Sequence, residues 1–246
     1  MRQKLSKRTL AAALGILVLI PACIVFGITV LGDRKYNFIS LSIILITMIP
    51  FFLGFEARKP KARELVVIAA LCGIAVAGRA AFFMIPQFKP VVAIVIITGV
   101  TLGPEAGFLV GAMTGFVSNF FFGQGPWTPW QMFCFGIIGF LFGLLVQKGI
   151  LPRQRWVLCF FGGAATVLIY GGIINISSVV SFSRAFSWKA LMAAYISGLP
   201  FDLIHGVSTA VFLFLFGNPM IEKIQRIQVK YGLLETEEEE DPPAKG

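Results

Sequence analysis

The sequence predicts an all-α integral membrane protein with about eight spans and both termini in the cytoplasm. Hydrophobic residues make up 57% of the 246 residues, the mean hydropathy is +0.85, and only 13% of the residues are charged. This composition is typical of a chain whose long apolar stretches cross a bilayer. We therefore expect a multi-pass protein of the cell (cytoplasmic) membrane, in contact with the lipid bilayer.

The apolar stretches follow one another along the chain, and most are long enough to span. They cover residues 10–31, 38–55, 65–85, 90–102, 104–122, 131–147, 156–177 and about 190–217. The fourth is short and Pro104 follows it, so the fourth and fifth stretches are predicted to form a tight hairpin whose first leg does not cross the full bilayer. Pro200 is expected to break the last stretch into an amphipathic piece, 187–198, and a true span, 199–217, because proline removes an interior hydrogen bond.

Lysine and arginine gather at one set of span ends. Fourteen are expected on the side of the N-terminus: Arg2, Lys4, Lys7, Arg8, Arg58, Lys59, Lys61, Arg63, Lys148, Arg153, Arg155, Lys223, Arg226 and Lys230. Five fall on the other side: Arg34, Lys35, Lys89, Arg184 and Lys189. Because basic loops stay in the cytoplasm, both termini are predicted to lie there. The net charge of +9 is thus mainly a topology signal, and no nucleic-acid partner is expected.

The chain divides into four parts. Two N-terminal transmembrane helices with basic cytoplasmic ends occupy 1–63, and the first apolar run lacks a small-residue cleavage site, so it is expected to be retained. A six-helix core follows over 64–218. Residues 219–234 alternate isoleucine with charged residues and predict a cytoplasmic amphipathic helix at the interface. Residues 235–246 form an acidic tail that is expected to be disordered.

The motifs of common enzymes are absent from the sequence. It contains no Gly-Lys-Ser/Thr, so it lacks the phosphate-binding loop of ATPases, and any ATP hydrolysis is expected on partner chains. The four cysteines lie within apolar stretches without metal-ligand spacing. We therefore expect no catalytic residue, no metal and no intrinsic cofactor.

Small residues recur at every fourth position in the middle of the chain, at Gly99, Gly103, Gly107, Gly111 and Gly115. They let neighbouring helices approach closely in a bilayer. They form either a plain packing seam or a smooth wall leading to a pocket. The turn that follows, Gly-Gln-Gly-Pro-Trp-Thr-Pro-Trp at 123–130, favours a pocket at the outer end.

Polar side chains within spans are costly and are therefore candidates for a functional site. Together with the aromatic turn, they are expected to gather at the outer end: Arg79, Gln87, Asn119, Gln124, Trp127, Trp130, Asn175, Asp202 and His205. Arg79 can neutralise an anionic ligand group or a buried acid, or it can extend to the headgroups. Aromatic walls with a few polar groups are typical of small-molecule sites.

Asp202 and His205 lie three residues apart and so share a helix face. Such a pair can be a catalytic dyad, a proton relay, a ligand clamp or a structural hydrogen bond. The alternative function is therefore an integral-membrane enzyme that uses these two residues as acid and base. No second carboxylate or nucleophile lies in register with them, which argues against an enzyme. A small channel is a third alternative, but the sequence has no charge rings.

A second small-residue face lies on the third span, where Ala69, Gly73, Ala77 and Ala81 follow one another at four-residue spacing. This face suits close packing of a helix, either from a partner protein or from the same bundle.

Residues 64–230 resemble the substrate-binding S components of energy-coupling factor (ECF) vitamin transporters. The resemblance rests on the small-residue face just described and on four segments, 87–90, 103–108, 119–132 and 198–205. Within the family, the turn at 123–130 is most similar to the cobalamin-type branch.

This resemblance implies a six-helix core that captures a vitamin from outside. The first candidate is cobalamin or a related corrinoid, carried as substrate and contacting the turn at Gln124, Trp127 and Trp130. Polar contacts are expected from Arg79, Asn119, Asn175, Asp202 and His205. The face at Ala69, Gly73, Ala77 and Ala81 would dock on a transmembrane coupling subunit driven by two ATPase subunits. The two N-terminal spans depart from the family pattern, and their role stays open.

Overall fold

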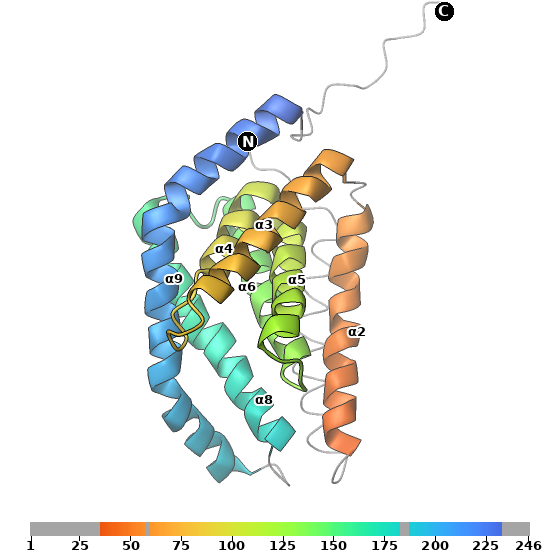
Figure 1. The fold of residues 1–246 in the computed structure, drawn as a ribbon, viewed down its shortest axis with the longest axis vertical. Coiled ribbons are helices and arrows are strands. Elements are labelled where there is room, and N and C mark those ends of the chain that lie inside the picture. The colour runs from red at the N-terminus through yellow and green to blue at the C-terminus, as the bar shows by residue number, and fades with distance from the viewer. Residues whose placement is uncertain (1–34, 58–59, 183–186, 233–246) are drawn as a thin grey trace, which may run out of the picture.

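The computed structural model describes residues 35–57, 60–182 and 187–232, and in these ranges the regular structure is entirely helical (Figure 1). In chain order the elements are α2 (Lys35–Ala57), α3 (Ala62–Ala81), α4 (Val91–Leu102), α5 (Pro104–Phe122), α6 (Thr128–Gln147), α7 (Arg155–Ala165), the π-helical segment η1 (Thr166–Gly171), α8 (Gly172–Phe182) and α9 (Trp188–Tyr231). The prediction of an all-helical protein is confirmed. The predicted first span, 10–31, and the acidic tail lie outside the described residues.

Five helical segments of the described chain are long and apolar enough to cross a membrane. They are α3, α5, α6, the continuous run from α7 to α8, and α9. Figure 1 shows α9 and α2 on opposite sides of the bundle, with α3 running obliquely across its front. These features fit an integral membrane bundle.

The short helix α4 lies at the centre of this bundle. All of its residues except Thr101 are buried, and it packs against α3, α5, α6, α7 and α9. Twelve residues rise only about 18 Å, which is short of the hydrocarbon thickness of a bilayer. The predicted short first leg of a hairpin is therefore confirmed. Gly103, with φ of 98°, makes the turn into α5, a conformation that favours glycine.

The glycines of the central ladder form a packing seam between α4, α5 and α6. A Cβ atom added at Gly107 would lie 2.7 Å from the carbonyl oxygen of Gly139, and one added at Gly111 would lie 2.5 Å from the carbonyl carbon of Phe135. Gly99 faces the same carbonyl oxygen of Gly139. Of the two interpretations of the ladder, close helix packing is the one that the structure bears out.

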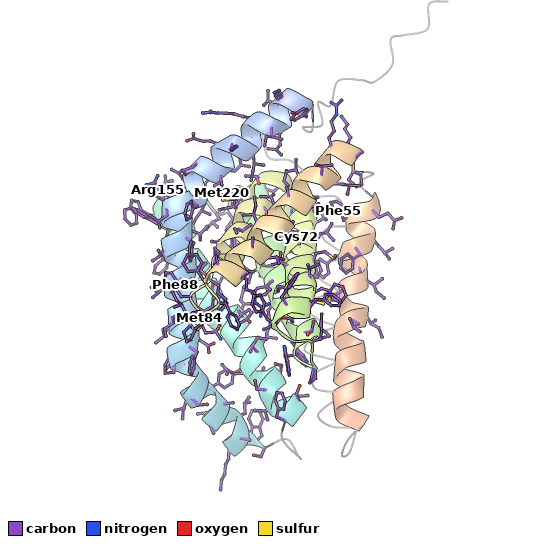
Figure 2. All side chains as sticks on the ribbon, viewed as in Figure 1. Phe55, Cys72, Met84, Phe88, Arg155 and Met220 are labelled. Carbon is purple, nitrogen blue, oxygen red and sulfur yellow. The ribbon has the colours of Figure 1, made fainter. Side chains whose placement is uncertain are left out.

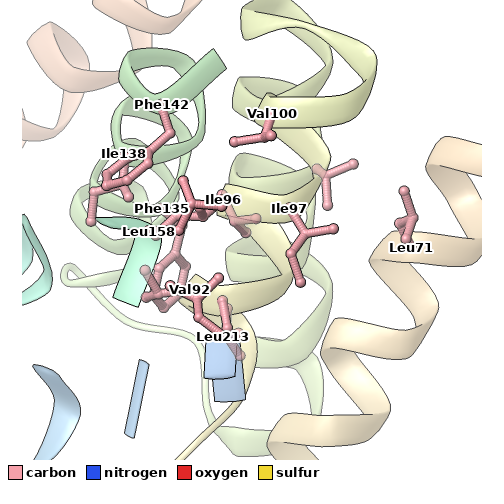
Figure 3. Packing of buried hydrophobic residues seen from close by; sticks show 14 of the residues in the cluster. Leu71, Val92, Ile96, Ile97, Val100, Phe135, Ile138, Phe142, Leu158 and Leu213 are labelled. Carbon is pink, nitrogen blue, oxygen red and sulfur yellow. The ribbon is translucent and has the colours of Figure 1, made fainter. Parts of the chain in front are cut away.

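The hydrophobic core surrounds α4 and continues between α5 and α6. In Figure 3, Val92 and Ile96 of α4 lie near Phe135 of α6 and Leu213 of α9. A second cluster forms on the side of α2, where the Phe51 ring stacks on Phe108 with centroids 3.7 Å apart. These contacts hold the central helices against one another. The polar groups that are described below lie toward the ends of α3, α5 and α6.

The expected break at Pro200 does not occur. The helix α9 runs without interruption over 44 residues and contains both Pro200 and Pro219. A proline removes one backbone donor, which a long helix tolerates when the remaining turns are well packed, and the common result is a bend. Figure 1 shows α9 curving along the bundle.

The segment predicted as a separate interfacial helix, 219–234, continues α9 as far as Tyr231. Its buried residues face the protein: Ile221 and Ile224 belong to the main core, and Gln228 donates from Nε2 to the carbonyl oxygen of Thr101 over 2.9 Å. Lys61 Nζ donates to the carbonyl oxygen of Gly232 over 2.8 Å. The start of α3 and the end of α9 therefore meet at one end of the bundle.

Candidate ligand-binding site

A cavity of about 80 Å³ lies between the end of α3, the 82–90 loop, α6, η1 and α9. Its polar lining residues are Arg79, Gln87, Lys89, Gln131, Tyr170 and His205, and Val91 and Phe135 complete the wall. Three of the sequence-predicted site residues, Arg79, Gln87 and His205, are thus brought together. The lining contains two cationic side chains and no carboxylate.

A chain of hydrogen bonds places Arg79 on the cavity wall. Its Nη1 donates to Ser118 Oγ and, over 2.9 Å, to Asn119 Oδ1, both near the end of α5. Asn119 Nδ2 in turn donates to Gln131 Oε1 over 2.9 Å, and Gln131 Nε2 donates to Tyr170 Oη over 3.3 Å. The network therefore connects α3, α5, α6 and η1, and Asn119 acts behind the cavity as a positioning residue.

His205 closes the deep side of the cavity. It is only 4% exposed, and its ring meets the Tyr170 ring edge-on with centroids 4.7 Å apart. Its Nδ1 has no hydrogen-bond partner in the described structure. Buried polar atoms are nearly always paired, so an unpaired nitrogen beside a cavity marks His205 as a candidate functional residue.

The 82–90 loop forms the mouth of the cavity and is tied to α9. The rings of Phe82 and Phe88 lie 5.1 and 5.3 Å from Phe212, and Figure 2 shows Phe88 at this junction. Ser208 Oγ of α9 donates to the carbonyl oxygen of Lys89 over 3.0 Å. Gln87 adopts a φ of 55°, which is uncommon for a residue with a side chain and is found more often at functional sites.

The cationic character of this mouth affects Lys89. Burial lowers the pKa of Lys89 below its ordinary value, and the nearby positive charge of Arg79 lowers it further. Among the described residues, Lys89 Nζ donates to the carbonyl oxygen of Ile85 at 3.3 Å. Arg79 and Lys89 therefore place two positive charges at the cavity, and the hydrogen-bond acceptors described for both are neutral oxygens.

The predicted pairing of Asp202 with His205 is wrong. Asp202 accepts a 2.8 Å hydrogen bond from Asn175 Nδ2 and lies close to Gly171, whereas His205 faces Tyr170. A spacing of three residues puts both side chains on one side of α9, but Asp202 lies against Asn175 of α8 and the last residue of η1, whereas His205 lies against Tyr170. The two residues consequently have different partners.

The aromatic turn lies beside the cavity and does not line it. Gln124 is exposed and donates from Nε2 to the carbonyl oxygen of Phe116 over 3.1 Å. Trp127 is half-buried and stacks on Phe182 with centroids 6.2 Å apart. Trp130 is 3% exposed and belongs to the core on the side of α2.

Gln131, Tyr170 and Lys89 are lining residues that sequence reasoning missed. Gln131 and Tyr170 are polar groups within otherwise apolar stretches, and that pattern could have identified them. Tyr170 lies in η1, and π-helical turns are frequent at functional sites. The π-helical geometry itself has no pattern in the sequence.

Comparison with known proteins assigns the bundle to a family. Residues 63–216 match the family model of the ECF transporter, substrate-specific component. The chain belongs to this family. It is 32% identical over 152 residues to a UPF0397 protein of Vibrio atlanticus and 32% identical over 155 residues to one of Aliivibrio fischeri. Each alignment covers 54% of this chain and 81% of the relative. No solved structure matches.

As a substrate-specific component, the chain is a transporter subunit of an ECF importer rather than an enzyme. The family implies docking onto an energising module of coupling subunit and ATPases. The docking surface predicted from the sequence is the small-residue face of α3. Ala69, Gly73, Ala77 and Ala81 are all exposed, and nothing lies within 4 Å of a Cβ atom added at Gly73. No other described element covers this face, so it is not used for packing within the described bundle.

Proposed function

We propose that this chain captures a water-soluble vitamin from outside the cell in the cavity beneath the 82–90 loop. It then delivers the vitamin inward when docked on a transmembrane coupling subunit with two ATPase subunits. The observation that carries the proposal is the convergence of six polar side chains on one cavity inside an otherwise apolar bundle. Polar groups are costly in a membrane protein and are kept where they bind something.

Delivery is proposed to use the face of α3 formed by Ala69, Gly73, Ala77 and Ala81. Its exposure supports this role, since a partner helix can approach closely only where side chains are small and no other helix is already packed. The same helix carries Arg79 at its last turn. Movement of α3 against a partner would therefore be transmitted directly to the cavity.

Cobalamin or a related corrinoid is the first cargo to test, on the resemblance of the turn at 123–130. The cavity of about 80 Å³ is much smaller than the roughly 300–1,000 Å³ of a typical ligand pocket. A corrinoid would therefore be held in the cavity by one group only, with its bulk lying toward the turn and Trp127. A smaller vitamin would need much less opening.

The contacts of Asp202 also favour a protein that binds its ligand without changing it chemically. An acid–base enzyme would need Asp202 and His205 to act together on a substrate, and each instead contacts a different neighbour. Because no observation favours an enzyme, transport is the only function that we propose.

Mass spectrometry of small molecules that co-purify with the detergent-solubilised chain tests the proposal. We expect one vitamin or vitamin precursor, recovered unchanged and in near-stoichiometric amount. Recovery of a chemically altered product, dependent on Asp202, would favour the enzyme instead. Uptake of the recovered compound by cells should then require both this chain and an ECF module.

A further inference from the structure

We propose that the cargo carries an anionic group, a carboxylate or a phosphate, and that this group binds in the cavity between Arg79, Lys89 and His205. The inference rests on the proposed function and specifies the chemical class of its substrate. It is argued from the charges, the hydrogen bonds and the volume of the cavity.

The first observation is a positive charge that no acidic lining residue compensates in the described part of the chain. Arg79 and Lys89 both line the cavity, and none of its lining residues is acidic. The partners described for Arg79 are neutral oxygens on Ser118 and Asn119 and the ring of Phe122, 5.1 Å from the guanidinium carbon. An isolated charge within a membrane protein is costly, so such groups are normally paired. Here the cavity itself is the place left for the opposite charge.

The second observation is that the donors face a common space. Both hydrogen bonds of Arg79 come from Nη1, whereas guanidinium has five N–H groups and suits bidentate binding of planar or tetrahedral oxyanions. His205 also lines the cavity, and its Nδ1 is buried and has no partner in the described structure. When it carries the proton, this nitrogen is a hydrogen-bond donor.

The third observation concerns size. A cavity of about 80 Å³ has room for several water molecules but is far smaller than the roughly 300–1,000 Å³ of a typical ligand pocket. That space suits a carboxylate or phosphate and not a whole vitamin. The anionic group is therefore the part of the cargo that enters most deeply, while the remainder lies toward the 82–90 loop.

Calorimetric titration of the purified full-length chain with matched pairs of compounds tests this inference. Each pair differs mainly in the anionic group: nicotinate and nicotinamide, pantothenate and panthenol, riboflavin and riboflavin 5′-phosphate. The first two pairs examine a carboxylate, and the third a phosphate ester. We expect the tightest ligand to be an anionic member that binds at least tenfold more tightly than its neutral partner.

The contribution of the cationic side chains to binding is tested with the variants Arg79→Gln and Arg79→Lys. We expect Arg79→Gln to weaken binding of the anionic ligand by roughly 10- to 100-fold, because a hydrogen-bonded charge pair is lost. The affinity for the neutral compound of the pair should change less than twofold, and Arg79→Lys should restore part of the affinity for the anionic one.

Lys89→Gln, at the mouth of the cavity, should weaken binding of the anionic ligand by about 2- to 5-fold. Lys189→Gln, which removes an exposed charge outside the cavity, is the matched control and should have no effect. Thermal unfolding of each variant shows that it is folded.

Two other outcomes would overturn the inference and can be told apart. If the tightest ligand is a neutral or cationic vitamin whose affinity is indifferent to folded Arg79→Gln, the anionic cargo is wrong while the proposed transport function stands. If no vitamin binds to the chain, neither from this panel nor as a co-purified molecule, the proposed function fails and the inference fails with it.

Discussion

Single side chains decide how the cavity is built, and Asn119 is the clearest case. It is 1% exposed and connects three polar groups, accepting from Arg79 and donating to Gln131 and to Thr128, the last over 3.0 Å. Thr128 also accepts from the backbone N–H of Gly125 in the aromatic turn. One amide therefore sets the position of the cationic wall and of the turn.

Replacing Asn119 by alanine should destabilise the protein and weaken cargo binding together. The change leaves the buried donors and acceptors of its partners unpaired, at a cost of about 1–3 kcal/mol of unfolding free energy. Thermal unfolding in detergent and calorimetric titration measure the two effects. Ser197→Ala, which removes an exposed hydroxyl bonded only within α9, is the control and should change neither. Unchanged stability and affinity in Asn119→Ala would show that the network is unimportant.

Trp127→Ala distinguishes a large cargo from a small one. If the cargo is a corrinoid that reaches the turn, loss of this half-buried ring should weaken binding by about 1–3 kcal/mol, or roughly 5- to 150-fold. A cargo confined to the cavity does not contact the ring and should bind the variant as it binds the wild type. An unchanged affinity for cobalamin would contradict the expected contact with the turn.

At the scale of secondary structure, α3 has two faces with different roles. Its buried apolar residues, Ile68, Leu71 and Ala75, pack into the bundle. The small residues Ala69, Gly73, Ala77 and Ala81 remain exposed beside the apolar side chains of Val66 and Ile74. Lipid can cover such a surface, but a partner helix packs better on small residues. The face is therefore the first place to look for the coupling subunit.

Gly73→Trp and Ala77→Leu should block uptake and leave binding by the isolated chain within about twofold. A large side chain prevents close approach of a partner helix, but Gly73 and Ala77 are exposed and do not line the cavity. Ala193→Leu, an exposed small residue of α9 changed in the same way, is the matched control and should transport normally. Parallel loss of binding and uptake in the α3 variants would assign this face to internal packing.

Some features of the helices could be predicted from the sequence, and others could not. Apolar length and glycine spacing predicted the helices, the short α4 leg and the close α4–α5–α6 contacts, because these depend on local composition. The continuity of α9 through Pro200 was mispredicted, since tertiary packing outweighs one lost hydrogen bond. The partners of Asp202 and His205 depend on how α8, η1 and α9 pack together, which no spacing within one helix specifies.

For the whole molecule, the distribution of basic residues predicts that both termini face the cytoplasm. Cysteine-accessibility labelling in a cysteine-free background tests this with Gln124→Cys and Lys223→Cys, two exposed positions near opposite ends of the bundle. A membrane-impermeant reagent should label Gln124→Cys in intact cells and Lys223→Cys only after permeabilisation. The reverse pattern would invert the topology and put the cavity mouth on the cytoplasmic side.

The central claim is that this chain alone, without any ATPase, is a high-affinity receptor for a vitamin. Isothermal titration of the purified chain with cobalamin and the other water-soluble vitamins tests it most directly. We predict one compound that binds with one-to-one stoichiometry below micromolar concentration and is recovered unchanged. If none of these vitamins binds below micromolar concentration to protein that is folded by thermal unfolding, the claim is contradicted.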